Sequence, residues 1–265
     1  MKFSRITLTL ASDLPYVARI TLSRPEVRNA FDDTTIAELT QAFRLTGQAD
    51  DVRAIVLDAQ GSAFCAGADL NWMKRMAGYS DEENRSDALA LATMLNTIYT
   101  CPKPVIAQVQ GDAYAGGMGL VSAADIVVAA DGVQFCLSEA KLGLIPATIA
   151  PYVIRAMGEQ AARRYFITAE RFDARQALHL GLVHELTAAS DLTETVAGLA
   201  QALAANSPNA VKECKKLVID FAHRTIDDTL ISDTAQRIAK IRASAEGREG
   251  IASFLEKRKP SWLER

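Results

Sequence analysis

The sequence predicts an α/β fold in which helices cover both faces of a buried sheet. Three short apolar runs, at residues 53–58, 105–109 and 126–130, have the length and composition of buried strands. Helix-length segments separate these runs, so the strands cannot pair through tight hairpins and need crossover connections. Strands connected in this way are normally covered by helices on both faces.

A hairpin and a helix are expected before the first buried strand. Residues 3–10 alternate between apolar and polar side chains, and residues 17–22 are typical of a returning strand after the turn at Asp13-Leu14-Pro15. Either Asp32 or Asp33 can cap the helix that follows. The predicted buried face of that helix, which ends at Gly47, consists of Ile36, Leu39, Ala42 and Phe43.

The last third of the chain is expected to be almost entirely helical. From about residue 188 onward the apolar side chains recur at helical spacing. Ser207-Pro208 is a strong helix start, because a hydroxyl can cap the helix and proline suits its first position. Residues 228–241 and 246–257 predict two further helices.

Composition and charge narrow the classes of function. The 265 residues are 49% hydrophobic and 23% charged, which is typical of a soluble globular chain. We expect a core over residues 1–190 and a helical region over residues 191–265 that caps the core or packs on a neighbouring subunit. A net charge of −3 argues against a global basic field for nucleic acid. Neither a membrane span nor a signal peptide is predicted, so we expect a cytoplasmic location.

Cysteine and histidine patterns give no indication of a metal site. The four cysteines lie far apart without a CxxC pair, which predicts buried, reduced thiols. The three histidines form no zinc-ligand pattern. We therefore expect no metal.

Two loops rich in small residues follow buried strands. Residues 61–70 read GSAFCAGADL, and residues 111–120 read GDAYAGGMGL. Small residues allow close backbone approach, and the free N–H groups at a helix start attract an oxygen anion. Two such loops side by side could form an oxyanion hole, whereas the alternative is tight strand–helix packing. Neither loop is a phosphate-binding P-loop or a GxGxxG dinucleotide fingerprint.

A lone glutamate stands in the apolar stretch at residues 135–147, FCLSEAKLGLIPA. Burying Glu139 without a partner would be costly, and burial would raise its pKa into a range that suits acid–base work. The alternative is a surface glutamate paired with Lys141 or an arginine.

Taken together, these stretches resemble the crotonase (enoyl-CoA hydratase/isomerase) superfamily. The resemblance is carried by RPEVRNAF, FCAGADL, the loop from Gly111, SE through LGLIP, and the C-terminal EGREGIASFLEKR. The order and spacing of these motifs match the family over nearly all of the chain. The resemblance implies a spiral of ββα repeats with a helical C-terminal region that forms trimers or dimers of trimers. It also implies an acyl-CoA thioester as substrate and no separate cofactor.

The resemblance also implies roles for particular residues. The backbone N–H groups of Ala68 and Gly116 would form the oxyanion hole, and Glu139 would be the acid–base group. Phe254 and Lys257 are expected near the adenine and phosphates of CoA, reached from a neighbouring subunit. The other expected substrate-contacting residues are Arg28, Ala30, Ala66, Asp69, Leu70 and Gly119.

One position departs from the pattern of the common hydratases, which use two glutamates. The first glutamate corresponds to Gly119, so Glu139 would act alone or with a polar neighbour. The candidates for that neighbour are Asp112, Tyr114 and Ser138. The bacterial 3-methylglutaconyl-CoA and γ-carboxygeranoyl-CoA hydratases resemble this chain in having glycine there. Because their substrates carry a second carboxylate, Lys141 and Arg155 are candidates to bind it.

Two other interpretations remain open at this point. A Δ3,Δ2-enoyl-CoA isomerase would use the single glutamate to move a proton between two carbons. A catalytically impaired member of the superfamily could instead bind RNA or act as a scaffold, through the lysines at 212, 215 and 216. A net negative chain makes nucleic acid the weaker expectation, and those lysines are more simply the solvated face of a helix.

Overall fold

A six-stranded sheet with the order β1-β2-β3-β5-β7-β10 forms the centre of the molecule. The computed structural model describes residues 3–11 and 14–263. The hairpin partner β1 is antiparallel to β2, and all other neighbours in this sheet are parallel. The strands are β1 (Ile6–Leu10), β2 (Val17–Leu22), β3 (Ala54–Ala59), β5 (Val105–Val109), β7 (Ile126–Ala130) and β10 (Glu185–Thr187).

A second, smaller sheet of four strands has the order β4-β6-β8-β9. Its first three strands are parallel, and β9 is antiparallel to β8. Each strand has only three residues: β4 (Ala63–Cys65), β6 (Asp112–Tyr114), β8 (Gln134–Cys136) and β9 (Arg171–Asp173).

The chain repeats a strand–strand–helix unit that connects the two sheets. In each unit the first strand (β3, β5 or β7) joins the large sheet, and the second (β4, β6 or β8) joins the small one. Each unit ends in one or more helices. The first unit ends in α2 (Leu70–Met76) and α3 (Asp81–Tyr99), the second in α4 (Gly116–Ala123), and the third in α5 (Ala150–Met157). Because β4, β6 and β8 are parallel, the loops that leave them meet at one edge of the small sheet.

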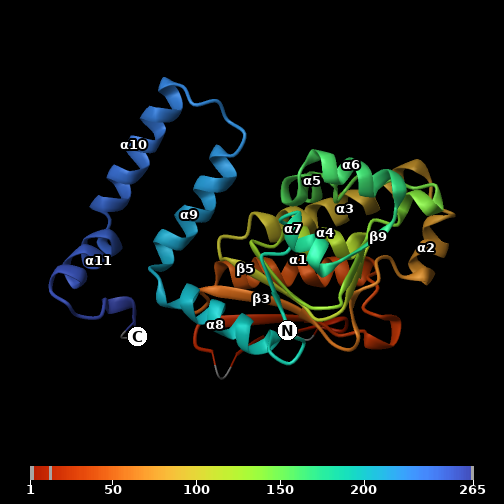
Figure 1. Cartoon of the computed structure of the whole chain (residues 1–265), viewed down its shortest axis with the longest axis horizontal. Coiled ribbons are helices and arrows are strands. Elements are labelled where there is room, and N and C mark those ends of the chain that lie inside the picture. Colours follow the sequence, from red (N-terminus) through yellow and green to blue (C-terminus); the bar gives the residue numbers. More distant parts are fainter. Residues whose placement is uncertain (1–2, 12–13, 264–265) are drawn as a thin grey trace.

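The helix expected after the hairpin is α1 (Asp33–Gln48), and Asp32 caps it by accepting the Thr35 N–H at 2.8 Å. Its predicted apolar face is buried in the core. Figure 1 shows α1 above the large sheet and α8 (Leu192–Ala205) below it, so helices do cover both faces. The remaining elements are α6 (Glu159–Thr168), α7 (Ala174–His179) and the 3₁₀ helices Pro25–Val27, Glu139–Leu142 and Ser261–Leu263.

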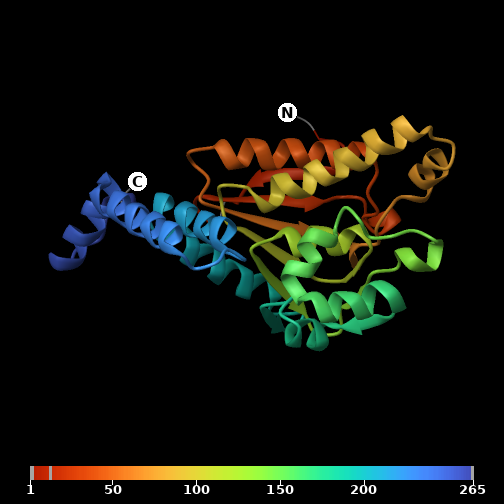
Figure 2. The same ribbon diagram turned by 90° about the horizontal axis from the view of Figure 1, so that it is seen from above.

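Three C-terminal helices extend away from the core as an arm (Figures 1 and 2). They are α9 (Pro208–Phe221), α10 (Asp228–Ala243) and α11 (Ala245–Leu255), and Ser207 caps α9 as expected. The expected division at residue 190 falls before α8, but α8 packs on the sheet through Val196 and Ala200. The arm therefore begins at α9. No helix in the described part of the chain is long and apolar enough to cross a membrane.

Candidate active site

Three loops from neighbouring parallel strands converge at one edge of the small sheet. Ala68 follows β4, Gly116 follows β6 and Glu139 follows β8. The first two loops touch, because a β-carbon built on Gly67 would lie 3.1 Å from the Ala115 β-carbon. The second and third are tied by a hydrogen bond of 2.8 Å from the Ala115 N–H to the Cys136 carbonyl.

The N–H groups of Ala68 and Gly116 are both outside the regular hydrogen-bond ladders. Ala68 forms an isolated parallel bridge with Phe31. That bridge uses the N–H groups of Phe31 and Asp69 and leaves the Ala68 N–H out. Gly116 is the first residue of α4, where N–H groups have no partner within the helix. Two such donors from adjacent loops are suited to binding one oxygen anion.

The residue before α4 has a strained backbone. Ala115 adopts φ +47° and ψ −118°, a conformation that residues with a side chain rarely take. Such strain costs on the order of 1–3 kcal/mol and is concentrated at functional sites. Gly117 is required by close packing, since its β-carbon would lie 2.6 Å from the Cys65 carbonyl oxygen.

Glu139 starts the 3₁₀ helix that follows β8, and its side chain is half-buried. Its Oε2 is buried, and within the described residues this oxygen has no hydrogen-bond partner. Burial raises the pKa of Glu139 above its ordinary value. The backbone N–H of Glu139 itself hydrogen-bonds the carboxylate and offsets part of this rise. A buried carboxyl group whose Oε2 has no partner among the described residues is a candidate for proton transfer.

Gly119 has no room for a side chain. A β-carbon there would lie 2.4 Å from the Ile149 Cγ2 and 3.3 Å from the Leu95 Cδ2. Both neighbours are buried core residues. The position that the resemblance assigns to a first glutamate is thus filled by apolar side chains.

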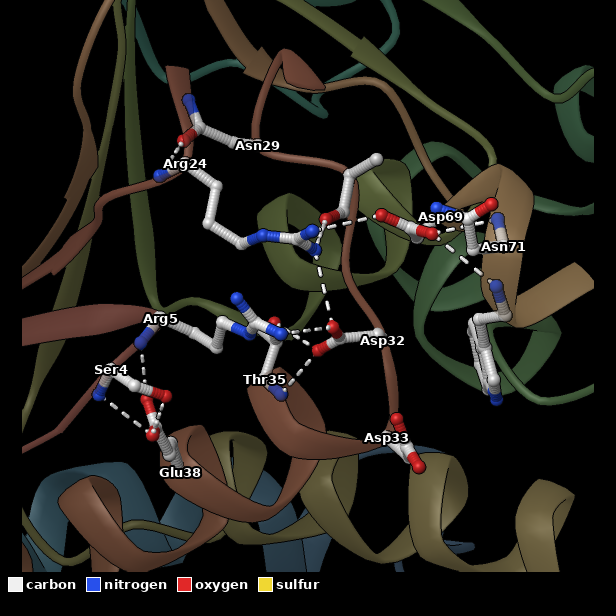
Figure 3. A network of polar contacts seen from close by, with 12 residues as sticks. Ser4, Arg5, Arg24, Asn29, Asp32, Asp33, Thr35, Glu38, Asp69 and Asn71 are labelled. Carbon is white, nitrogen blue, oxygen red and sulfur yellow. Dashed lines mark hydrogen bonds and ion pairs between the residues drawn. The ribbon is translucent and has the colours of Figure 1, made fainter. Parts of the chain in front are cut away.

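A polar network holds the loop that carries Ala68 (Figure 3). The Arg24 guanidinium donates to the Asp69 carboxylate at 2.9 Å and to the Ala30 carbonyl at 2.8 Å. It also pairs with Asp32 at 3.4 Å. Asn29, from the same RPEVRNAF motif as Arg24, donates to the carbonyls of Gln60 and Ala63 at 2.7 and 2.9 Å.

Asp69 was expected to contact the substrate, but its carboxylate has protein partners on both oxygens. One oxygen caps α2 by accepting the N–H groups of Asn71 and Trp72, and the other accepts from Arg24. Burial raises the pKa of Asp69, but these hydrogen bonds and the Arg24 charge outweigh it and lower the pKa overall. Asp69 therefore supports the loop, as an aspartate directly before a helix commonly does.

A pocket of about 280 Å³ lies beside the network and brings together two of the expected substrate-contacting residues. Arg28 and Ala66 line it, together with Asp112 and Tyr114. The Tyr114 hydroxyl donates to Asp112 at 2.9 Å, so these two polar candidates lie with Arg28 and Ala66. Ala30, two residues after Arg28 in the sequence, is buried. Leu70, at the start of α2, is 74% exposed.

Phe254 lies in the last turn of α11 and Lys257 follows that helix, on the arm rather than beside the three loops (Figure 1). Phe254 is 81% exposed. Lys141 and Arg155 are also exposed, and Arg155 donates to the Pro151 carbonyl at 2.8 Å.

The lysines of α9 do not form a uniform solvated face. The Lys215 side chain is only 9% exposed, and its Nζ pairs with Asp125 at 2.7 Å and donates to the Lys103 carbonyl. This ion pair ties the arm to the sheet, because Asp125 immediately precedes β7. Lys212 and Lys216 are exposed, which is a weak basis for binding nucleic acid.

The cysteines follow the expectation of buried thiols at three positions out of four. Cys65, Cys101 and Cys136 are buried, and burial raises the pKa of Cys65 to about 12. Cys214 is exposed on α9 and departs from the expectation. Within residues 3–11 and 14–263, no three His, Cys, Asp or Glu side chains gather as metal ligands would.

Comparison with known proteins decides the family. The family model described as enoyl-CoA hydratase/isomerase matches residues 15–265. The chain belongs to the enoyl-CoA hydratase/isomerase family. The crystal structure of an enoyl-CoA hydratase from Shewanella pealeana is 42% identical with a TM-score of 0.95, over 98% of this chain and 97% of that one. The fold is therefore the α/β crotonase fold, with helical C-terminal elements.

Curated relatives within the enoyl-CoA hydratase/isomerase family carry hydratase names. The enoyl-CoA hydratase AKT6-1 of Alternaria alternata is 34% identical over 91% of this chain and 79% of its own length. The mevalonyl-coenzyme A hydratase sidH of Aspergillus fumigatus is 30% identical over 94% of this chain and 92% of its own length.

Two residues that shape the site, Phe31 and Ile149, are not predicted as site residues from the sequence. Phe31 lies inside the RPEVRNAF motif, but Ile149 has no local signal in the sequence.

Proposed function

We propose that this enzyme adds water to, or removes it from, the C2=C3 bond of an α,β-unsaturated acyl-CoA. In this proposal the N–H groups of Ala68 and Gly116 bind the thioester oxygen, and Glu139 transfers the proton. The observation that carries the proposal is the buried Oε2 of Glu139, which has no partner among the described residues. Its loop adjoins the loop of Gly116, which in turn touches the loop of Ala68, so Glu139 is available to a substrate or water there.

The two donors stabilise the charge that develops on the thioester oxygen as the C3–oxygen bond forms. One oxyanion donor is typically worth about 10²–10³ in rate. The Glu139 carboxylate takes a proton from water while the water oxygen bonds to C3, and the acid so formed returns a proton to C2. The raised pKa of Glu139, caused by burial, suits a group that must hold and release a proton. The reaction is redox-neutral, and coenzyme A is part of the substrate.

As the acyl group we propose 3-methylglutaconyl, which places the enzyme in leucine degradation. The support is the resemblance to hydratases that have glycine at the position of Gly119 and whose substrates carry a second carboxylate. Lys141 and Arg155 are the proposed contacts for that carboxylate, since both are exposed cations in the segment that follows β8.

A specific observation keeps Δ3,Δ2-enoyl-CoA isomerisation as the second candidate. The space beside Gly119 is filled by Ile149 and Leu95, so this side of the site offers no carboxylate to orient water. A single base that moves a proton from C4 to C2 needs no such water. The same Glu139 and the same two N–H groups would serve this reaction.

We also propose that the enzyme self-associates as a trimer or a dimer of trimers through its arm. Phe254 and Lys257 lie away from the three loops of their own chain, so their proposed contact with CoA requires a neighbouring copy. Exposed apolar side chains support this, and they include Val218, Ile226, Ile231, Ile251 and Leu255.

The substrate proposal is tested with three thioesters on the purified protein. Loss of enoyl-thioester absorbance with 3-methylglutaconyl-CoA, faster than with crotonyl-CoA, supports the proposed hydratase. Fast turnover of crotonyl-CoA instead indicates a general hydratase. Conversion of a 3-enoyl-CoA to its 2-enoyl isomer, with neither of the other two hydrated, establishes the isomerase. Replacing Lys141 and Arg155 by Met without a rise in KM for the carboxylated substrate would remove their proposed role.

A further inference from the structure

Phe31 contacts both loops that supply the proposed oxyanion donors. Its backbone forms the parallel bridge at Ala68, in which the Phe31 N–H donates to the Gly67 carbonyl at 2.9 Å. The Phe31 carbonyl accepts the Asp69 N–H at 3.0 Å. The residues on either side of Ala68 are therefore held by one residue, which fixes the direction of the Ala68 N–H.

The ring of Phe31 packs against the other donor. A β-carbon built on Gly116 would lie 2.2 Å from the Phe31 Cζ and 2.7 Å from its Cε1. The ring is fully buried, and its centroid lies 6.0 Å from that of the buried Trp72. A close-packed ring of this kind leaves the first turn of α4 little room to move.

The residues around Phe31 make its position rigid. Arg24 donates to the carbonyl of Ala30, which precedes Phe31, and pairs with Asp32, which follows it. The same guanidinium donates to Asp69 on the other side of the bridge. Figure 3 shows Arg24 between Asp32 and Asp69. The Arg24 guanidinium thus makes charge-assisted contacts with both segments of the bridge, the one that contains Phe31 and the one that contains Ala68.

We infer that Phe31 is a positioning residue that sets the separation and direction of the Ala68 and Gly116 N–H groups. It touches no reacting atom itself. The inference rests on the proposed function, because it requires that these two groups bind one oxygen. A displacement of about 1 Å at such a site can lower the rate about 100-fold.

The test uses acetoacetyl-CoA, a β-keto thioester whose enolate absorbs more strongly in the near ultraviolet than its keto form. Bound to a working oxyanion hole, the probe ionises at lower pH than in solution. We expect Phe31→Leu to lose most of this shift and to lower kcat about 10- to 100-fold with little change in KM. Phe43→Leu is the matched control, because Phe43 is equally buried but lies on α1. It should keep the shift.

The outcomes separate this inference from the proposed function. No enolate shift in the unaltered enzyme overturns the proposed oxyanion hole and the inference with it. A shift that Phe31→Leu retains in full, with kcat unchanged, overturns the inference alone. If Phe31→Leu does not fold, Phe31→Met decides, because its flexible side chain keeps more of the volume of the ring. We expect Phe31→Met to lose part of the enolate shift, and a shift retained in full with kcat unchanged contradicts the inference.

Discussion

The Cγ2 of Ile149 lies 2.4 Å from the place where a β-carbon on Gly119 would stand. Ile149 is buried directly before α5, and its branched side chain cannot swing away as the end of a long chain could. The departure from the two-glutamate pattern is therefore accompanied by packing that leaves no free space for a side chain at position 119.

Changes at Gly119 test this packing. Gly119→Ala should lower the free energy of unfolding by about 1–3 kcal/mol through overpacking, despite the better helix propensity of alanine. Urea denaturation measures this loss. Gly119→Glu combined with Ile149→Ala should gain crotonyl-CoA hydration relative to Ile149→Ala alone, because a second carboxylate then has room. An unchanged free energy of unfolding in Gly119→Ala would show that the Ile149 side chain moves aside at no cost and would contradict this account of the packing.

Glu139 should reduce stability at neutral pH while serving the reaction. Burial raises its folded pKa, so its contribution is favourable below the unfolded pKa and is lost as pH rises through the folded pKa. Glu139→Gln should therefore raise Tm at pH 7–8, and the gain should shrink toward pH 4. The control is Glu170→Gln, since an exposed pair with Arg164 lowers the pKa of Glu170. Glu170→Gln should show no such gain in Tm. An equal gain in both variants would contradict the conclusion that burial of Glu139 costs stability at neutral pH.

Replacing Arg24 should lower the free energy of unfolding more than replacing an exposed arginine does. Its side chain is 12% exposed and pairs with two buried carboxylates, Asp32 and Asp69. Arg24→Met removes the cation that pairs with Asp69 and leaves Asp32 with Arg5 alone, so it should cost about 3–5 kcal/mol in urea unfolding. Arg75→Met is the control, because its pair with Asp33 is exposed and should be worth less than about 1 kcal/mol. Equal losses in the two variants would refute the structural role of the network.

Self-association should be visible in solution. Light scattering on size-separated protein should give the mass of three or six chains. Val218→Asp with Ile231→Asp should reduce that mass, because both side chains are exposed apolar residues of the arm. A monomer in the unaltered protein would contradict the proposed assembly and the contact of Phe254 with a neighbouring CoA.

The large sheet could be predicted from the sequence because its strands are long enough to show a pattern. Val105–Val109 is entirely buried and apolar except for Gln108, and the turns around it mark its ends. The strands of the small sheet have three residues each, which is too short for periodicity to detect. The convergence of the three loops follows from that small sheet. It could be expected only through the family resemblance.

Side-chain partners were harder to predict than elements. Asp69 lies in a motif next to the candidate site, but Arg24, 45 positions earlier, takes its carboxylate. Lys215 has the spacing of a solvated helix face, whereas Asp125 binds it against the sheet. In each case the deciding contact is long-range and leaves no local signal.

The measurement that tests the central claim most directly is the turnover of 3-methylglutaconyl-CoA by the unaltered enzyme and by Glu139→Gln. Glutamine keeps the size of the side chain but cannot take a proton from water. We predict that the enoyl absorbance falls with the unaltered enzyme and that kcat drops about 10²–10⁴-fold in the variant, with its fold intact by circular dichroism. A folded variant whose kcat stays within a few-fold of the unaltered enzyme would contradict the role of Glu139.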